Sequence, residues 1–204
     1  MAVLDLPTNL LSAHFEFGLR KTTLGFKSPQ NGTAQNIDFL SERWVVSMTL
    51  PSRRKEEGGE VEGFMNFLSG GVNRVRLFHQ GKGANSATHG LPYGTLRGAP
   101  TLSVAAVRGN NSFTLQTMAN ATIKAGDMLS FGGHLFQARA TAQDNASGVM
   151  TFLTANRARG NIAAGSSVIW NKPTAEFILP ANALMHGSHQ GYFAGGTFDF
   201  EEWF

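Results

Sequence analysis

The stretch WVVSMTL at residues 44–50 decides the fold class, because its large apolar residues occupy every second position. Successive side chains of a β-strand point to opposite faces of the sheet. Trp44, Val46, Met48 and Leu50 would therefore share one buried face. A proline follows, and since proline cannot donate a hydrogen bond to a neighbouring strand, the strand is predicted to end there.

A helix is predicted directly after this strand, over about residues 56–69. Apolar residues recur there at the spacing i, i+3, i+4 and i+7, which places them on one side of a helix. They are Val61, Phe64, Met65 and Leu68. Glutamates in the first turns and Gly70-Gly71 after the last turn suit the two ends. Internal glycines each cost up to about 1 kcal/mol relative to alanine, so we expect this helix to dock against a sheet.

The chain beyond the helix alternates between strand patterns and turn residues. Val75 and Leu77 alternate with arginines, as in a half-exposed strand. Residues 80–100 are rich in glycine and proline and are interpreted as a long loop or a domain boundary. Residues 102–170 carry short strand patterns separated by turn sequences such as Gly132-Gly133. This spacing is typical of a compact barrel or sandwich.

Both ends of the sequence also carry β patterns. Phe198 and Phe200 alternate with acidic residues, and a free strand of this kind would expose an apolar edge. The strand is therefore predicted to return to a sheet. Residues 1–36 hold short apolar clusters broken by Ser28-Pro29 and Asn31-Gly32, a pattern that suits either hairpins or an extended arm.

The charged residues give little support for nucleic-acid or membrane binding. The chain has 17 Lys and Arg against 14 Asp and Glu, a formal charge of +3, and the basic residues are dispersed. Sequence-specific nucleic-acid recognition needs a basic patch or stripe. No window approaches the roughly 18 apolar residues of a membrane span, and the first residues lack the pattern of a signal peptide. We therefore expect no membrane partner, and synthesis and folding in a cytoplasm.

The sequence predicts no catalytic, cofactor-binding or metal site. It has no cysteine, and no nucleophile elbow or phosphate-binding loop occurs in a convincing context. Among the histidines only His186 and His189 lie three residues apart, in a predicted loop where exposed polar groups are the simpler interpretation. The six histidines are His14, His79, His89, His134, His186 and His189.

Two further sets of polar residues are candidates for catalytic or binding roles. Four aspartates could supply a glycosidase pair in some fold, but any β protein offers such pairs. They are Asp38, Asp127, Asp144 and Asp199. Asp127 is better explained as a turn residue that binds backbone amides. Arg157 and Arg159 would project from one side of an extended segment and meet an acidic neighbour, or else lie in a solvated loop. We expect no enzymatic activity.

Two stretches together resemble small virion proteins encoded among the tail genes of tailed phages of Gram-negative bacteria. The first is residues 44–51, followed by FMNFLSGGVN at 64–73 and the strand at 74–78. The second begins with KAGDMLSFGGHLF at 124–136. It continues through residues 148–157, 165–168 and 173–179. The resemblance spans residues 37–180 and lies in the order and texture of these segments.

The resemblance implies a distal-tail-like or tail-tube-like structural protein of mainly β fold. A β sandwich or split barrel flanked by one α-helix would carry an inserted small β-barrel domain. Residues 1–85 and 172–204 would form the ring-forming domain, 86–99 a linker loop, and 100–171 the insertion. No long hairpin of the kind that lines the lumen of a tail tube is evident.

The same resemblance implies the partners and the location. The protein would form or cap a homo-oligomeric ring, a hexamer, at the distal tail or baseplate hub of the virion. Neighbouring tail tube, hub or fibre proteins would contact it. The N-terminal arm and residues 80–100 are the predicted contacts between subunits, because neither can form a core of its own.

Two other classes of function stay open. Exposed aromatic residues such as Trp170, Tyr192 and Trp203 could stack on sugars in a carbohydrate- or host-surface-binding β sandwich. The abundant aromatic residue is phenylalanine, with 16 copies, which is a core residue and weakens this interpretation. The third class is a hydrolase of a cell-wall polymer. Glycan-array binding and an activity screen on peptidoglycan would distinguish these two.

Overall fold

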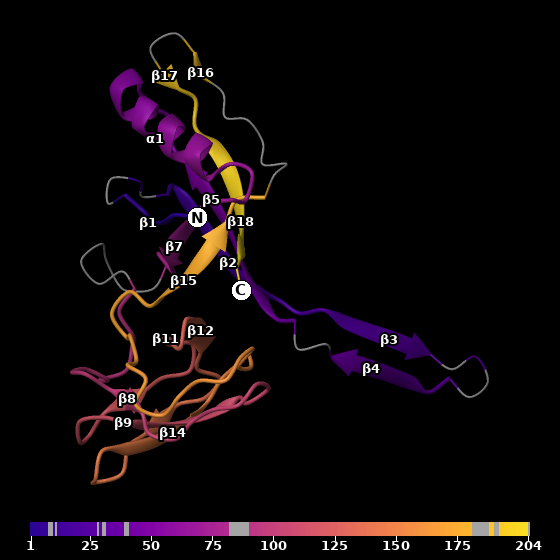
Figure 1. Cartoon of the computed structure of the whole chain (residues 1–204), viewed down its shortest axis with the longest axis vertical. Coiled ribbons are helices and arrows are strands. Elements are labelled where there is room, and N and C mark those ends of the chain that lie inside the picture. The colour runs from indigo at the N-terminus through magenta and orange to yellow at the C-terminus, as the bar shows by residue number, and fades with distance from the viewer. Residues whose placement is uncertain are drawn as a thin grey trace. The chain divides into compact units, whose positions relative to one another are not determined.

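The computed structural model describes residues 1–7, 10, 12–27, 29, 32–38, 41–81, 90–180, 188–189 and 192–203. This part of the chain is mainly β with a single α-helix, as the sequence predicts (Figure 1). Its contacts divide the chain into two compact units. The first unit comprises residues 1–18, 44–91 and 171–204, and the second comprises residues 19–43 and 92–170.

The described elements follow one another along the chain as short strands around one helix. They are β1 (Val3–Asp5), β2 (His14–Arg20), β3 (Thr23–Lys27), β4 (Ala34–Asp38), β5 (Arg43–Leu50), β6 (Arg53–Arg54), α1 (Lys55–Leu68), β7 (Arg74–Phe78), β8 (Thr101–Leu102), β9 (Ser112–Gln116), β10 (Thr122–Ile123), β11 (Met128–Phe131), β12 (His134–Gln137), β13 (Ala142–Gln143), β14 (Val149–Leu153), β15 (Thr174–Ile178), β16 (Ser188–His189), β17 (Tyr192–Phe193) and β18 (Gly196–Glu202).

The first unit is built on a six-stranded sheet in the order β1-β7-β15-β18-β5-β2. Trp44, Val46, Met48 and Leu50 of β5 are all buried and alternate with half-exposed residues, which confirms the predicted strand and its buried face. The C-terminal strand β18 lies between β15 and β5, with its two phenylalanines buried. The alternating aromatic segment therefore does return to a sheet.

The helix α1 docks against a small sheet, as its glycine content required. Val61, Met65 and Leu68 are buried, and the predicted ends of the helix are correct to within one residue. A methyl group at Gly58 would collide with the side chain of Phe193 in β17. Glycine at this position thus permits the close approach of helix and strand, which offsets its low helix propensity.

The second unit contains a small closed β-barrel. β8, β9 and β14 form one sheet and β11 and β12 another. The bridge Ala138↔Thr154, just beyond the ends of β12 and β14, joins the β11–β12 sheet to the three-stranded sheet. At the other side, the bridges Ser130↔Ile169 and Thr101↔Ser167 join β11 to β8 through residues 167–169. The circuit of strands is therefore complete, and closure leaves no free edge within it.

Phenylalanines fill the interior of this barrel. The ring of Phe113 lies 5.1 Å from that of Phe131, 4.7 Å from that of Phe136 and 5.9 Å from that of Phe152. The rings of Phe131 and Phe136 stack at 4.4 Å. All four side chains are buried, so the barrel encloses a packed core.

The predicted turns of this unit are confirmed. Gly132 and Gly133 join β11 to β12 with φ angles of +59° and +78°, the left-handed conformation that a two-residue hairpin loop requires. Asp127 is buried and accepts hydrogen bonds from the amides of Tyr93 at 2.7 Å, Gly94 at 3.0 Å and Lys124 at 2.8 Å. It is therefore the amide-binding turn residue that its sequence context indicates.

Part of the glycine-rich segment at 80–100 belongs to this barrel. Residues 92–100 are counted with the second unit, and Leu96 is fully buried in its core. Residues 92–99, which the sequence assigned to a linker, are thus fastened by their amides and by an apolar anchor. Residues 82–89 lie outside the described residues.

Candidate functional site

A two-stranded hairpin near the N-terminus presents an apolar surface. β3 and β4 pair antiparallel in five residue pairs, from Thr23↔Asp38 to Lys27↔Ala34 (Figure 1). Leu24 lies opposite Ile37, and Phe26 is two residues beyond Leu24. Because directly opposed residues and alternate residues share a side of a sheet, Leu24, Phe26 and Ile37 lie on one face. We call these three residues the hairpin face.

The hairpin face is open to solvent. Leu24 is 56% exposed, Phe26 61% and Ile37 51%. In the part of the chain that the structure describes, β3 and β4 pair only with each other. A two-stranded hairpin is at best marginally stable alone in water, and clustered exposed apolar residues mark sites of interaction. The hairpin therefore has both an uncovered face and unpaired strand edges.

This hairpin decides between the two interpretations left open for residues 1–36, at least over residues 23–38. The five-pair ribbon of β3 and β4 is a hairpin, one of the two structures that the sequence left open. Sequence pattern alone does not choose the hairpin over an extended arm, because a glycine separates the two apolar residues of β3. Leu24-Gly25-Phe26 with Ile37 was the available signal.

The two ends of the hairpin meet a buried carboxylate. Glu42 is only 3% exposed, and its Oε1 lies 2.9 Å from Nζ of Lys21. The backbone amide of Arg157 donates to Oε2 of Glu42 at 2.6 Å, and the guanidinium of Arg159 donates to the Glu42 carbonyl at 3.1 Å. Glu42 therefore lies beside Arg157 and Arg159, with its carboxylate bound by the Arg157 backbone amide and its backbone carbonyl bound by the Arg159 guanidinium.

His134 lies next to this group. Nη2 of Arg159 donates to Nδ1 of His134 at 3.3 Å, so Nδ1 is the accepting nitrogen. Burial, and secondly the positive charge of Arg159, lower the pKa of His134 from its usual value of 6.5 to about 4. The imidazole is consequently neutral at physiological pH.

The remaining histidines form no shared site among the described residues. The imidazole of His14 pairs with the carboxylate of Glu16 at 3.0 Å on the surface, and His79 packs its ring against Phe17 at 4.9 Å. His89, His186 and the side chain of His189 lie outside the described residues. No group of three or more His, Cys, Asp or Glu residues that could hold a metal ion occurs in the described part of the chain.

The four aspartates considered as a possible glycosidase pair have different surroundings in the structure. Asp127 is structural, and Asp199 is exposed on β18. The side chain of Asp38 lies outside the described residues. Asp144 sits in the 144–148 loop, where its amide donates to the Ala121 carbonyl at 3.2 Å.

The aromatic residues proposed for sugar stacking are partly occupied by arginines. The guanidinium of Arg97 lies 5.0 Å from the ring of Trp170, and the indole N–H donates to the Gly98 carbonyl at 2.9 Å. The guanidinium of Arg74 lies 4.5 Å from the ring of Trp203. Each tryptophan therefore has one face covered by a cation within its own unit.

Comparisons with known proteins give no match from which a function could be assigned. No protein-family model matches the chain, and no curated protein matches it. The described helix is too short and too polar to be a membrane span.

Proposed function

We propose that this chain is a structural subunit of a phage tail that assembles with copies of itself into a ring at the distal tail or baseplate hub. The assembly part of the proposal is carried by one observation, the exposed hairpin face on a ribbon with unpaired edges. The tail part is supported by the resemblance of residues 37–180 to virion proteins. The subunit would reside in the virion, assembled in the host cytoplasm, and would act without catalysis.

A ring explains the hairpin more fully than a single partner does. Both edges of the ribbon and its apolar face need cover. Closed cyclic symmetry gives every copy a neighbour on each side, so each edge is paired and no open filament grows. A ring of six copies, in contact with neighbouring tail tube, hub or fibre proteins, is the arrangement that the resemblance implies.

The test is the mass of the purified protein by light scattering, with negative-stain images of the same sample. We expect rings of defined order for the natural sequence and monomers for Leu24→Ser/Phe26→Ser. Val104→Ser is the matched control, because Val104 is an exposed apolar residue of the same unit outside the hairpin. A wild-type protein that stays monomeric at high concentration, alone and with the adjoining tail proteins, would overturn the proposal.

A carbohydrate- or host-surface-binding module is the second candidate, and it rests on Tyr192, which is 62% exposed. It has less support because the two tryptophans proposed with it already bind guanidinium groups. Glycan-array binding that is lost on Tyr192→Ala would favour this function over the ring.

A further inference from the structure

An ion pair between Lys21 and Glu42 joins the two chain segments that lead into and out of the hairpin. We call these two residues the neck of the hairpin. Lys21 stands two residues before β3 and Glu42 four residues after β4. Nζ of Lys21 lies 2.9 Å from Oε1 of Glu42, which fixes the separation of the two chain segments that lead into and out of the ribbon. The ion pair therefore holds the two segments together at the base of the hairpin.

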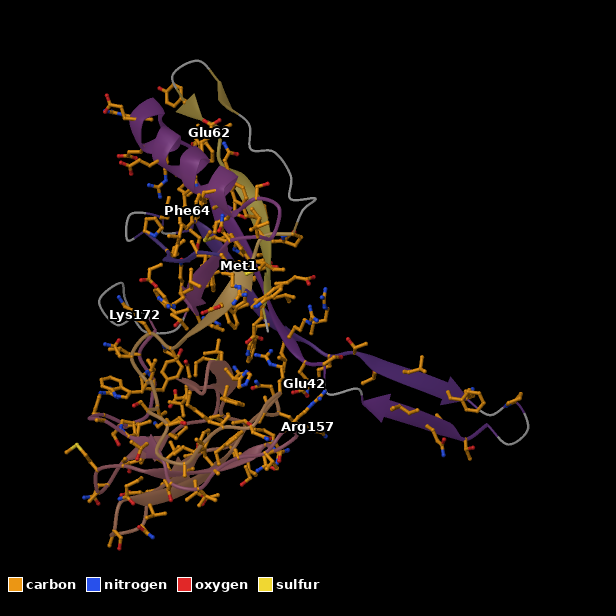
Figure 2. All side chains as sticks on the ribbon, in the orientation of Figure 1. Met1, Glu42, Glu62, Phe64, Arg157 and Lys172 are labelled. Carbon is orange, nitrogen blue, oxygen red and sulfur yellow. The ribbon has the colours of Figure 1, made fainter. Side chains whose placement is uncertain are left out.

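Both members of this pair also bind one loop of the barrel, residues 155–159. Nζ of Lys21 donates to the Ala155 carbonyl at 3.0 Å. The amide of Arg157 donates to Oε2 of Glu42 at 2.6 Å, and the Arg159 guanidinium donates to the Glu42 carbonyl. Figure 2 labels Glu42 and Arg157 near the base of the hairpin. Each carboxylate oxygen of Glu42 therefore has its own donor.

The barrel loop that receives these contacts is itself held firmly. Asn156 is buried, its side-chain amide donates to the Leu135 carbonyl at 2.8 Å, and its Oδ1 accepts from the Gln137 amide at 3.2 Å. The hydroxyl of Thr154 donates to the Asn156 carbonyl at 2.6 Å. The amide of Ala158, a fully buried residue, donates to the Asn110 carbonyl at 2.8 Å. The neck is consequently fastened to a rigid part of the barrel.

Burial makes Glu42 the central member of this cluster. Its side chain is 3% exposed whereas that of Lys21 is 46% exposed. A buried carboxylate is tolerated only when donors surround it, and losing them is far more costly than losing an exposed ion pair. The hydrogen bond from the Arg157 amide is charge-assisted and is the stronger kind.

We infer that Glu42 is a positioning residue for assembly: together with Lys21 it clamps the neck to the barrel, so that the hairpin face is presented in one orientation before a second copy binds. A ribbon free to swing at its neck would lose that freedom on association, and the entropy cost would weaken binding. The clamp itself is a property of the single subunit, while its effect on association rests on the proposed ring function.

The clamp is tested by hydrogen exchange and limited trypsin digestion of Glu42→Ala and Glu42→Gln under monomeric conditions. In Glu42→Ala the Arg157 amide should exchange at least about tenfold faster, which corresponds to loss of one hydrogen bond. Cleavage after Lys27 should accelerate, while the amides of Phe113 and Phe152 keep their protection. Glu42→Gln retains an acceptor and should lie between Glu42→Ala and the wild type.

A second ion pair supplies the matched control. Asp5 pairs with Arg76 at 3.2 Å on the surface, so Asp5→Asn removes a carboxylate without touching the neck. This variant should leave the exchange of the Arg157 amide unchanged. An Arg157 amide and a Lys27 cleavage rate that are the same in both Glu42 variants as in the wild type would overturn the clamp.

The assembly step is measured separately by light scattering over a concentration series. Glu42→Gln should need about tenfold more protein than the wild type to form the same rings. Rings that form at wild-type concentrations despite a loosened neck would overturn the positioning role. A wild-type protein that forms no rings would overturn the proposed function instead, and the exchange data would still decide whether the clamp exists.

Discussion

Two β regions of the second unit carry apolar residues at alternating positions and end in opposite situations. In the barrel, Phe113 and Phe152 are at most 2% exposed, whereas in the hairpin Phe26 is 61% exposed. The barrel strands complete a circuit, so each apolar side chain meets others across the interior. Among the described residues, the hairpin has two strands that pair only with each other. Alternating apolar residues therefore define one apolar face of a strand, but the residues that bury this face can belong to another molecule.

Truncation in the barrel should have the largest effect on stability. Phe113→Ala removes the ring that touches three other rings, and we expect the free energy of unfolding to fall by about 3–5 kcal/mol. Urea unfolding followed by hydrogen exchange of the barrel peptides measures the loss. Val104→Ala, an exposed position of the same unit, is the control and should change little. A loss below about 1 kcal/mol for Phe113→Ala would mean that the barrel is loosely packed.

Removing the buried carboxylate of Asp127 should have the next largest effect. Asp127→Ala would leave the amides of Tyr93, Gly94 and Lys124 without their acceptor. Unsatisfied buried donors make a loss of about 2–4 kcal/mol the expected result. The same urea experiment measures it, with Asp199→Ala, an exposed aspartate, as control. Equal stability of both variants would show that water replaces the carboxylate freely.

The stability of the barrel should depend on pH through His134. Its folded pKa of about 4 lies below the usual 6.5, so between these values the unfolded chain binds a proton that the folded chain does not. Stability should therefore fall as the pH drops from 6.5 to 4 and level off below it. For a half-buried ring screened by solvent, the change is on the order of 1–2 kcal/mol.

This pH dependence has a direct control. Urea midpoints of His134→Gln should show a smaller decline over the same pH range, because glutamine does not titrate. An unchanged slope in that variant would assign the decline to groups other than His134.

A hairpin substitution should have the smallest effect on stability and sharpens the comparison most. Phe26→Ser should change the free energy of unfolding of the monomer by no more than about 0.5 kcal/mol, since the ring is already exposed. Thermal unfolding in dilute solution measures this. A loss comparable with that of Phe113→Ala would contradict the open hairpin and place Phe26 in a core.

The sequence was most informative where one period dominated. The two-residue period at 44–50 and the helical period at 56–69 defined their elements to within a residue, and Gly132-Gly133 defined a hairpin loop. The exposure of Leu24 and Phe26 could not be predicted, because an apolar pattern destined for a partner is identical to one destined for a core.

The sequence indicated only one side of the contact between the neck and the barrel. The spacing of Arg157 and Arg159 indicated a possible acidic neighbour, but Glu42 is 115 residues away from Arg157 in the chain. Local pattern carries no information on such a pairing, which depends on how the barrel loop and the hairpin neck come together.

The position of β18 has a consequence for the order of folding during synthesis. This strand lies inside the six-stranded sheet, between β15 and β5, and the Trp44 amide donates to a Glu202 carboxylate 158 residues away. Closing such long loops slows folding. The second unit contains no residue after Trp170, whereas the six-stranded sheet cannot close until β18 has been made. Until β18 is in place, the edges of β5 and β15 that it pairs with have no partner strand in the described sheet.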